Sequence, residues 1–237
     1  MGQQIDKWEK SSNKQRKQAE ARRYLNIKPY HMKTLFVNLF LVLFLLLIAS
    51  CKKKTANSYY YSAEASYYSK NYDSALADIN KAIGLEPKYV DAYTLKARVE
   101  LALFQFGEAK LDCKKAISLY PKEARACYTL AEIAKETSDH QGEINAYTML
   151  IAIEPDSAGN YDSRASVRHQ SGDFAGAIQD YNKCIQLKPN DGSYYYWRGD
   201  VKVDAGDADG ACEDFHKAKA LGDPGADAAI DLNCGGI

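Results

Sequence analysis

A fixed 34-residue spacing recurs through most of the chain and limits the folds that it can adopt. The prolines at Pro87, Pro121, Pro155 and Pro189 follow one another at this interval. The thirteen residues that end at Pro87, Pro121 and Pro189 share one frame, with a small residue first, Asp fourth, Lys seventh and Leu eleventh. A fixed period of this length is typical of stacked-repeat folds, in which each unit buries its apolar face against its neighbours.

Each period has room for two helices. Aromatic residues precede the frame by three positions, where they could pack at a helix crossing: Tyr72, Phe106 and Phe174. Small residues before them, such as Ala165 and Gly199, would let the two backbones of a unit approach closely. Each proline would end the second helix, because it lacks the N–H group and clashes with the preceding turn. We therefore expect antiparallel helix pairs.

The pattern of aromatic and small residues resembles that of the tetratricopeptide repeat. The fourth unit carries it most fully, in Tyr161, Ala165, Gly172, Phe174, Ala177, Tyr181, Cys184 and Pro189. The resemblance implies an all-α fold, an α-solenoid of about five stacked helix pairs with a C-terminal capping helix. The expected units are 56–89, 90–123, 124–157, 158–191 and 192–222, followed by a cap and tail at 223–237. The third unit departs from the pattern, since Glu143 and Leu150 replace two alanines.

The chain begins with a polar, basic extension at 1–31, which precedes a second possible start at Met32. A nucleic-acid-binding arm is one interpretation of its charge. We favour the alternative, that it lies upstream of the true start.

Residues 32–50 have the layout of a secretory signal. Lys33 is followed by an apolar run at 35–48 and by two small residues. The run is shorter than the roughly 20 residues that a membrane-spanning helix needs. Ile48-Ala49-Ser50-Cys51 resembles the lipobox of bacterial lipoproteins, which implies cleavage before Cys51 and acyl chains on it. An uncleaved anchor helix is the alternative. Residues 51–55 would be the lipidated Cys and a polar tether.

The charge balance argues against nucleic acid as a partner. The chain has 31 basic and 31 acidic residues, of which nine and three lie in 1–50, so the remainder has 22 and 28 and a net charge of about −6. An acidic body is poorly suited to phosphate backbones.

A cation on the expected first helix recurs with an Asp on the second. Antiparallel pairing would bring Lys96 to Asp112, Arg164 to Asp180 and Arg198 to Asp214. We expect ion pairs that fix the register of each helix pair, although such pairs add little net stability. The alternative is that the cations belong to a binding site.

The five cysteines after Cys51 are an odd number, so at least one stays free or pairs elsewhere. A Cys212–Cys234 disulfide would fasten the cap in an oxidising compartment. Cys113 and Cys127 could also meet. Cys184 stands where the repeat has Ala and is expected to be a small buried apolar residue.

The sequence indicates neither an enzyme nor a cofactor site. The histidines are scattered, and there is no Gly-x-Ser-x-Gly, phosphate-binding Gly-rich loop, His-Glu-x-x-His or Cys-x-x-Cys motif. We therefore expect no catalytic residue, no metal, no cofactor and no small-molecule substrate.

The remaining class of function is the recognition of other proteins. In the family that the repeats resemble, the first helices line a concave groove, and Tyr and Arg are residue types that often dominate binding energy. By position the groove candidates are Tyr60, Tyr67, Arg98, Arg125, Tyr128 and Tyr196.

These features predict a lipid-anchored bacterial lipoprotein that acts as a protein-interaction scaffold in the cell envelope, facing the periplasm. Two alternatives are an accessory subunit that binds peptidoglycan or glycan for an envelope enzyme or secretion machine, and a co-chaperone anchored by an uncleaved N-terminal helix.

Overall fold

The computed structural model describes residues 8, 10, 12–23 and 54–235, which divide into two units between Lys54 and Thr55. In the first unit, residues 12–23 are helical and their side chains are exposed. The sequence does not predict this helix, because it has no apolar period that would bury a face. The expected signal segment, Cys51 and most of the tether lie outside the described residues. None of the helices described is both long and apolar enough to cross a membrane.

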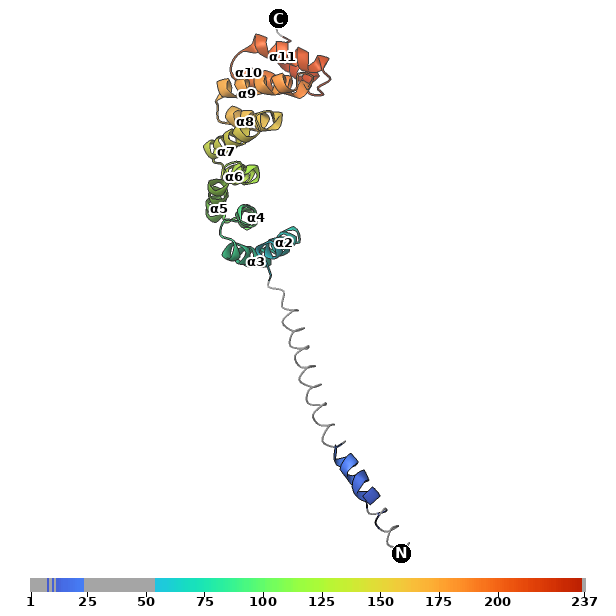
Figure 1. Ribbon diagram of the computed structural model, residues 1–237. Coiled ribbons are helices and arrows are strands. Elements are labelled where there is room, and N and C mark those ends of the chain that lie inside the picture. Colours follow the sequence, from blue (N-terminus) through green and yellow to red (C-terminus); the bar gives the residue numbers. More distant parts are fainter. Residues whose placement is uncertain (1–7, 9, 11, 24–53, 236–237) are drawn as a thin grey trace. The chain divides into compact units, whose positions relative to one another are not determined.

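The second unit confirms the predicted all-α solenoid of antiparallel helix pairs (Figure 1). No strand occurs among the residues that the structure describes. In chain order the helices are α2 (Ala56–Tyr68), α3 (Tyr72–Leu85), α4 (Val90–Ala102), α5 (Phe106–Leu119), α6 (Ala124–Glu136), α7 (His140–Ile153), α8 (Ala158–Gln170), α9 (Phe174–Leu187), α10 (Gly192–Asp204), α11 (Ala208–Ala220) and α12 (Ala226–Asn233).

Aspartate side chains fix where the second helices of the last three repeats begin. Asp139, Asp173 and Asp207 each accept a hydrogen bond from the backbone N–H three residues later, at 2.9, 2.9 and 3.0 Å. The donor is a glycine in all three. A Cβ atom at Gly176 would lie 2.1 Å from Asp173 Oδ2, so the cap in its present position needs a residue without a side chain there.

The turn between the two helices of each repeat contains one residue in the left-handed backbone conformation. Positive φ angles recur once per period, at Lys70, Phe104, Ser138, Gly172 and Gly206. Glycine adopts this conformation without strain, whereas the other three side chains make it less favourable.

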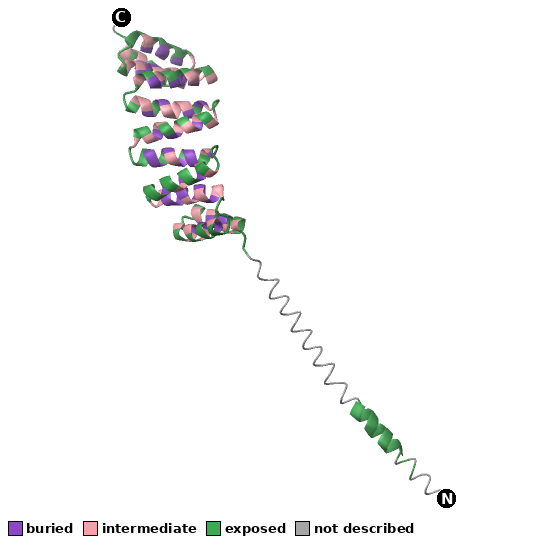
Figure 2. Cartoon of the chain, turned by 60° about the vertical axis from the view of Figure 1, so that its left-hand side comes forward, coloured by how far each residue is buried: buried purple, intermediate pink, exposed green. Residues whose placement is uncertain are grey.

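The core lies between paired helices and between neighbouring pairs, and its buried residues line the inside of the stack in Figure 2. Ala97 and Ala165 are fully buried. A Cβ at Gly199 would lie 2.8 Å from the Phe215 ring, so this helix pair approaches closely only because the residue is glycine. The aromatic residues that precede the frame are partly buried against the core: Tyr72, Phe106 and Phe174.

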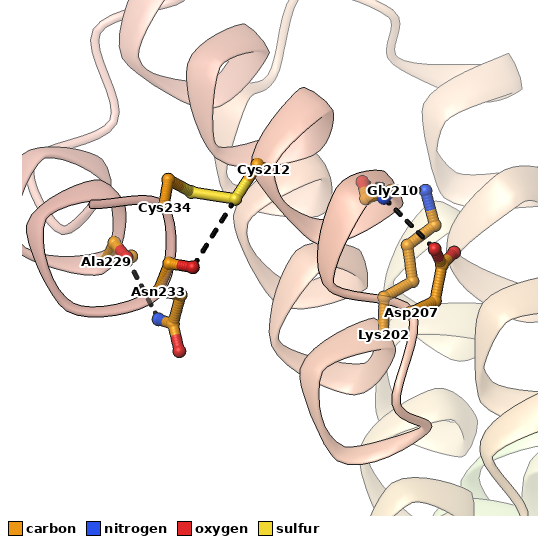
Figure 3. The surroundings of a disulfide bond; sticks show 7 residues. All are labelled: Lys202, Asp207, Gly210, Cys212, Ala229, Asn233 and Cys234. Carbon is orange, nitrogen blue, oxygen red and sulfur yellow. Dashed lines mark hydrogen bonds between the residues drawn. A yellow bond between two sulfur atoms is a disulfide. The ribbon is translucent and has the colours of Figure 1, made fainter. Parts of the chain in front are cut away.

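Helix α12 packs on α11 and covers the last apolar face of the solenoid. Cys212 of α11 and Cys234, just after α12, form a disulfide (Figure 3). The Sγ atom of Cys212 also lies 3.7 Å from the backbone carbonyl oxygen of Asn233. The capping helix is therefore tied covalently to the repeat that it covers.

The first helices of the first three repeats lie closer together than any two second helices of the described solenoid. Helix α4 packs directly against both α2 and α6, whereas no two second helices of the described solenoid are in comparable contact. Because the stack is tighter on the side of the first helices, we take that side as the inner, concave face.

Candidate binding surface of the solenoid

The cation and Asp of a repeat meet between its two helices in three repeats. Lys96 Nζ lies 2.6 Å from Asp112 Oδ2. Arg164 contacts Asp180 through two hydrogen bonds of 2.9 and 2.7 Å, and Arg198 contacts Asp214 through two of 2.8 and 2.5 Å. Asp180 and Asp214 are buried. These residues are therefore occupied within the fold, which disfavours the alternative that the cations belong to a binding site.

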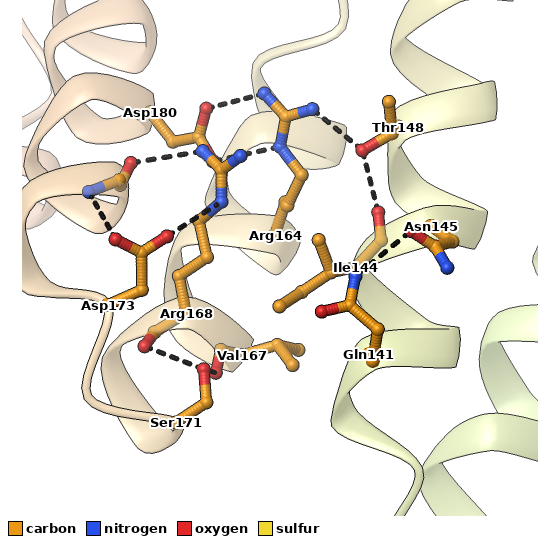
Figure 4. A network of polar contacts seen from close by, with 11 residues as sticks. Gln141, Ile144, Asn145, Thr148, Arg164, Val167, Arg168, Ser171, Asp173 and Asp180 are labelled. Atoms are coloured by element: carbon orange, nitrogen blue, oxygen red, sulfur yellow. Dashed lines mark hydrogen bonds and ion pairs between the residues drawn. The ribbon is translucent and has the colours of Figure 1, made fainter.

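A second cation, absent from the sequence-based expectation, completes this cluster in the fourth and fifth repeats. Arg168 Nη1 lies 2.8 Å from Asp180 Oδ2 (Figure 4). In the fifth repeat, Lys202 Nζ lies 2.8 Å from Asp214 Oδ2. Each buried carboxylate is thus shared by two cations. The signal was present in the sequence, since Arg168 and Lys202 are themselves one period apart.

The second repeat has the opposite charge at this place. Glu100 occupies the position of Arg168 and Lys202, and its Oε1 lies 3.2 Å from Lys96 Nζ. Its other oxygen is buried without a partner among the described residues. Burial and then the charge of Asp112 raise the pKa of Glu100 to about 7, against the effect of Lys96.

The other three cysteines of the described solenoid do not pair with one another. Cys113, Cys127 and Cys184 are buried free thiols, so the second disulfide that the sequence allowed is not formed. Burial raises their pKa values to about 12, 11 and 12 respectively. Thiols that stay protonated are poor nucleophiles and poor metal ligands, so these cysteines act as small apolar residues.

Four of the six groove candidates lie on the inner face and bridge neighbouring first helices. The Arg98 guanidinium stacks over the Tyr67 ring, 4.7 Å from its centre. Arg125 contacts Asp91 of the preceding first helix. The Tyr128 hydroxyl donates a hydrogen bond of 2.8 Å to Asn160 Oδ1 of the following one. The sequence did not predict these contacts between repeats, although each joins residues about one period apart.

For the other two candidates, Tyr60 and Tyr196, the structure differs from the prediction. Tyr60 is only 8% exposed, because its ring packs against Tyr89 at 5.3 Å, and it belongs to the core of the first repeat. Tyr196 packs against Phe215 at 5.8 Å, and its ring lies close to Gly225, just before the capping helix. The position in the repeat is inner-facing, and the segment before the cap partly covers this copy of it. Tyr60 is therefore not available to a partner in the way that the sequence predicts, whereas Tyr196 is partly covered.

A hollow on the inner face lies between the third, fourth and fifth repeats. It has a volume of about 750 Å³ and is lined mainly by polar side chains. Lys135, Glu143, Asp162, Ser166 and Trp197 line it, from α6, α7, α8 and α10. The indole of Trp197 is 46% exposed, so this inner-face pocket combines an accessible aromatic surface with charged groups of both signs.

Three carboxyl groups in and beside this pocket, those of Glu143, Asp162 and Asp200, are left without a hydrogen-bond or ion-pair partner by the described solenoid. Asp162 and Asp200 are partly buried, and neither makes a hydrogen bond or ion pair with another described residue. Burial raises the pKa of Asp162, and the charge of Asp191 adds to this effect. Burial likewise raises the pKa of Asp200, against the effect of nearby His169, and the charge of Asp204 adds to the rise. Such a half-buried carboxylate is only partly accessible to water, and a donor on a bound ligand would replace that water.

His169 lies at the edge of the same pocket and is held in place by another repeat. Its Nε2 atom is 2.6 Å from Asp204 Oδ2, across the fourth and fifth repeats. No group of three or more His, Cys, Asp and Glu side chains that could hold a metal ion occurs in the described ranges. The surface therefore offers hydrogen-bond acceptors, a few cations and aromatic faces.

Comparisons with known proteins agree with this geometry. Models of the tetratricopeptide repeat match residues 90–123 and 130–196, so these segments contain such repeats. No match was found among curated proteins.

Solved structures with the same fold include two of MamA and one of YrrB. One MamA structure is 23% identical, with a TM-score of 0.61 over 73% of this chain and 94% of that one. MamA of Desulfovibrio magneticus RS-1 is 17% identical, with a TM-score of 0.58 over 70% and 94%. YrrB, a tetratricopeptide repeat protein described as having an unusual peptide-binding site, is 17% identical, with a TM-score of 0.61 over 80% and 96%. The chain thus contains tetratricopeptide repeats and shares the fold of these solved structures.

Proposed function

We propose that this protein is a lipid-anchored scaffold of the bacterial cell envelope whose inner face binds a peptide segment of a partner protein. The observation that carries the binding role is the pair of partly buried carboxyl groups, Asp162 and Asp200, which the described solenoid leaves unpartnered in and beside the 750 Å³ pocket. A peptide offers backbone N–H donors and Lys or Arg side chains that would satisfy both. The peptide-binding site described for YrrB is consistent with this role for the fold.

Trp197 and Tyr147 give the pocket a second means of recognition. Both line it, and Trp197 is about half exposed. Aromatic side chains bury a large area at low entropic cost, which is why they dominate many interfaces. We therefore expect the bound segment to place a basic residue near Asp162 and an apolar or planar group on Trp197.

Site-specific photocrosslinking in cells tests the binding role. Benzoylphenylalanine at Ser166, which lines the pocket, should capture a defined partner, whereas the same group at exposed Gln179 of α9 should not. Asp162→Asn and Asp200→Asn should weaken the capture from Ser166 without lowering stability. Asp231→Asn, at an exposed position of α12, is the matched control. The proposal would be contradicted if both crosslinker positions gave equal products. It would also be contradicted if purified cell-wall sacculi retained the protein and no partner protein were captured.

The lipid anchor is supported by the sequence alone, through the apolar run at 35–48 and the small residues that precede Cys51. Two or more acyl chains would hold the protein stably on a membrane. Intact-mass and acyl-labelling measurements on the wild type and Cys51→Ala test it. A lipidated wild type that begins at Cys51, with an unlipidated variant, supports the anchor; an unmodified wild type that keeps Met1 or Met32 refutes it.

A further inference from the structure

The third repeat lacks the buried charge cluster of the second, fourth and fifth repeats. Its three positions are filled by Leu130, Ala134 and Ala146, which correspond to Arg164, Arg168 and Asp180 one repeat later. In the first repeat the same two helices are still joined by a hydrogen bond of 2.7 Å from Ser62 to Asp78. The third repeat is therefore the one in which apolar residues replace the polar contacts.

A pocket opens at the place where this cluster is missing. It has a volume of about 320 Å³, within the range of about 300–1,000 Å³ that is usual for ligand sites. Its apolar lining consists of Leu130, Ile133, Ala134, Ala146 and Met149. In Figure 4 the equivalent space of the fourth repeat is occupied by the guanidinium groups of Arg164 and Arg168 around Asp180. The small and apolar side chains of the third repeat leave that space open.

This flank pocket is separate from the inner-face pocket. Leu130 and Tyr128 are two positions apart on α6, which places them on nearly opposite sides of a helix that turns about 100° per residue. Tyr128 belongs to the inner face, so Leu130 opens to the flank, between α5, α6 and α7.

The rim of the flank pocket is mainly positive. Lys110 and Lys114 of α5 line it, together with Asp139. Lys110 Nζ lies 3.5 Å from Asp139 Oδ2, and both side chains are about half exposed. In the next two repeats the residue equivalent to Lys114 accepts a hydrogen bond from the Arg of the following first helix, as Thr148 does from Arg164. Leu130 offers no such bond, and Lys114 has no partner in the described part of the chain.

We propose that the flank pocket docks a segment of a partner protein in which a bulky apolar side chain is followed by an acidic residue. The apolar side chain would fill the space above Leu130 and Ala146. The carboxylate would pair with Lys114, the rim cation that no described residue contacts. This is a second docking surface, independent of the inner-face pocket and of the lipid anchor.

Methyl-labelled NMR of the full-length protein in mild detergent tests the proposal with two defined peptides. Acetyl-Gly-Leu-Glu-Gly-amide should shift the methyl signals of Leu130, Ile133 and Met149, whereas the charge-reversed acetyl-Gly-Leu-Lys-Gly-amide should shift them far less. Lys114→Glu should weaken binding of the first peptide by about 2- to 5-fold, the effect of losing an exposed ion pair, and strengthen binding of the second. Lys115→Glu, at the next position of α5, is the matched control: it is exposed, does not line the pocket and should change neither.

A filled-pocket variant makes the test independent of charge alone. The double change Leu130→Arg and Ala146→Asp installs the pair found in the fourth repeat. It should abolish the peptide-induced shifts of the Ile133 and Met149 methyl signals while the chain keeps its helical circular dichroism spectrum. No shift of these methyls with either peptide would overturn the proposal. Equal shifts with both peptides, or shifts that persist in the double variant, would overturn it as well.

Discussion

Arg164 holds Asp180 through two parallel hydrogen bonds between α8 and α9, and the geometry leaves this carboxylate residue only 3% exposed. Arg168 binds the same carboxylate from one helical turn further on. Removing it leaves two partly buried cations without a counter-charge. We expect Asp180→Ala to lower the free energy of unfolding by about 3–5 kcal/mol, the usual effect of breaking a buried pair.

Urea unfolding followed by circular dichroism measures this change. Asp173→Asn is an informative comparison, because Asn can still cap α9, while Asp173 contacts Arg168 at 3.5 Å, is about half exposed and should matter less. A loss for Asp180→Ala no larger than that for Asp173→Asn would show that the cluster does not hold the two helices together.

The raised pKa of Glu100 predicts that the free energy of unfolding depends on pH. Its pKa is raised to about 7 from an ordinary value of 4.5, so the folded chain holds a proton that the unfolded chain has lost between these values. Stability should therefore fall as the pH rises from about 4.5 through about 7. Glu100→Gln should remove this slope and stabilise the protein at pH 8 by on the order of 1–3 kcal/mol.

Unfolding in urea at pH 5 and at pH 8 separates this effect from general acid sensitivity. The exposed Glu132→Gln, on the neighbouring α6, should leave the difference between the two pH values unchanged. If Glu100→Gln were as pH-sensitive as the wild type, Glu100 would not be the group responsible.

Phe104 predicts a gain of stability on substitution. It has a φ angle of 60° and its side chain is 74% exposed, in the turn where the fourth and fifth repeats have glycine. A non-glycine residue in the left-handed region costs about 1–2 kcal/mol, partly offset by the greater freedom of glycine in the unfolded chain. We expect Phe104→Gly to raise the melting temperature and Gly172→Ala to lower it. A lower melting temperature for Phe104→Gly would mean that contacts of the Phe104 ring, such as that with Phe106, outweigh the backbone strain. A higher one for Gly172→Ala would contradict the argument from strain.

The 34-residue period and the aromatic, small and proline positions within it were sufficient to predict the solenoid and the antiparallel pairing of its helices, and that pairing in turn predicted the cation–Asp contacts. The prediction failed at Tyr60, whose burial depends on a loop residue that is not part of the shared pattern, and it missed the partial covering of Tyr196. Tyr60 is covered by Tyr89 of the loop before α4, and Tyr196 is partly covered by the capping segment. The position of a residue in the repeat predicts which face of the solenoid its side chain points to. How exposed that side chain is depends on the residues that pack against it.

The two pockets could not be predicted for a different reason. Asp162 and Asp200 are ordinary inner-face carboxylates in the sequence, and their lack of partners within the described solenoid depends on packing among four helices. The flank pocket had a signal, since Leu130 and Ala146 break the charge pattern at fixed positions of the frame. The sequence alone could not show that the missing ion pair of the third repeat leaves an open pocket.

The disulfide between Cys212 and Cys234 makes the two ends of the solenoid unequal. Each repeat is stabilised chiefly by its neighbours, so an array of this kind opens from whichever end is least well held. The C-terminal end is closed by a bridge spanning 22 residues, whereas α2 has neighbours on one side only within the described solenoid. Fraying should therefore advance from α2 towards α11, and reduction should allow it to start at both ends. In hydrogen exchange this asymmetry would give a gradient of protection along the chain that has a direction under oxidising conditions and becomes more symmetric when the bridge is reduced.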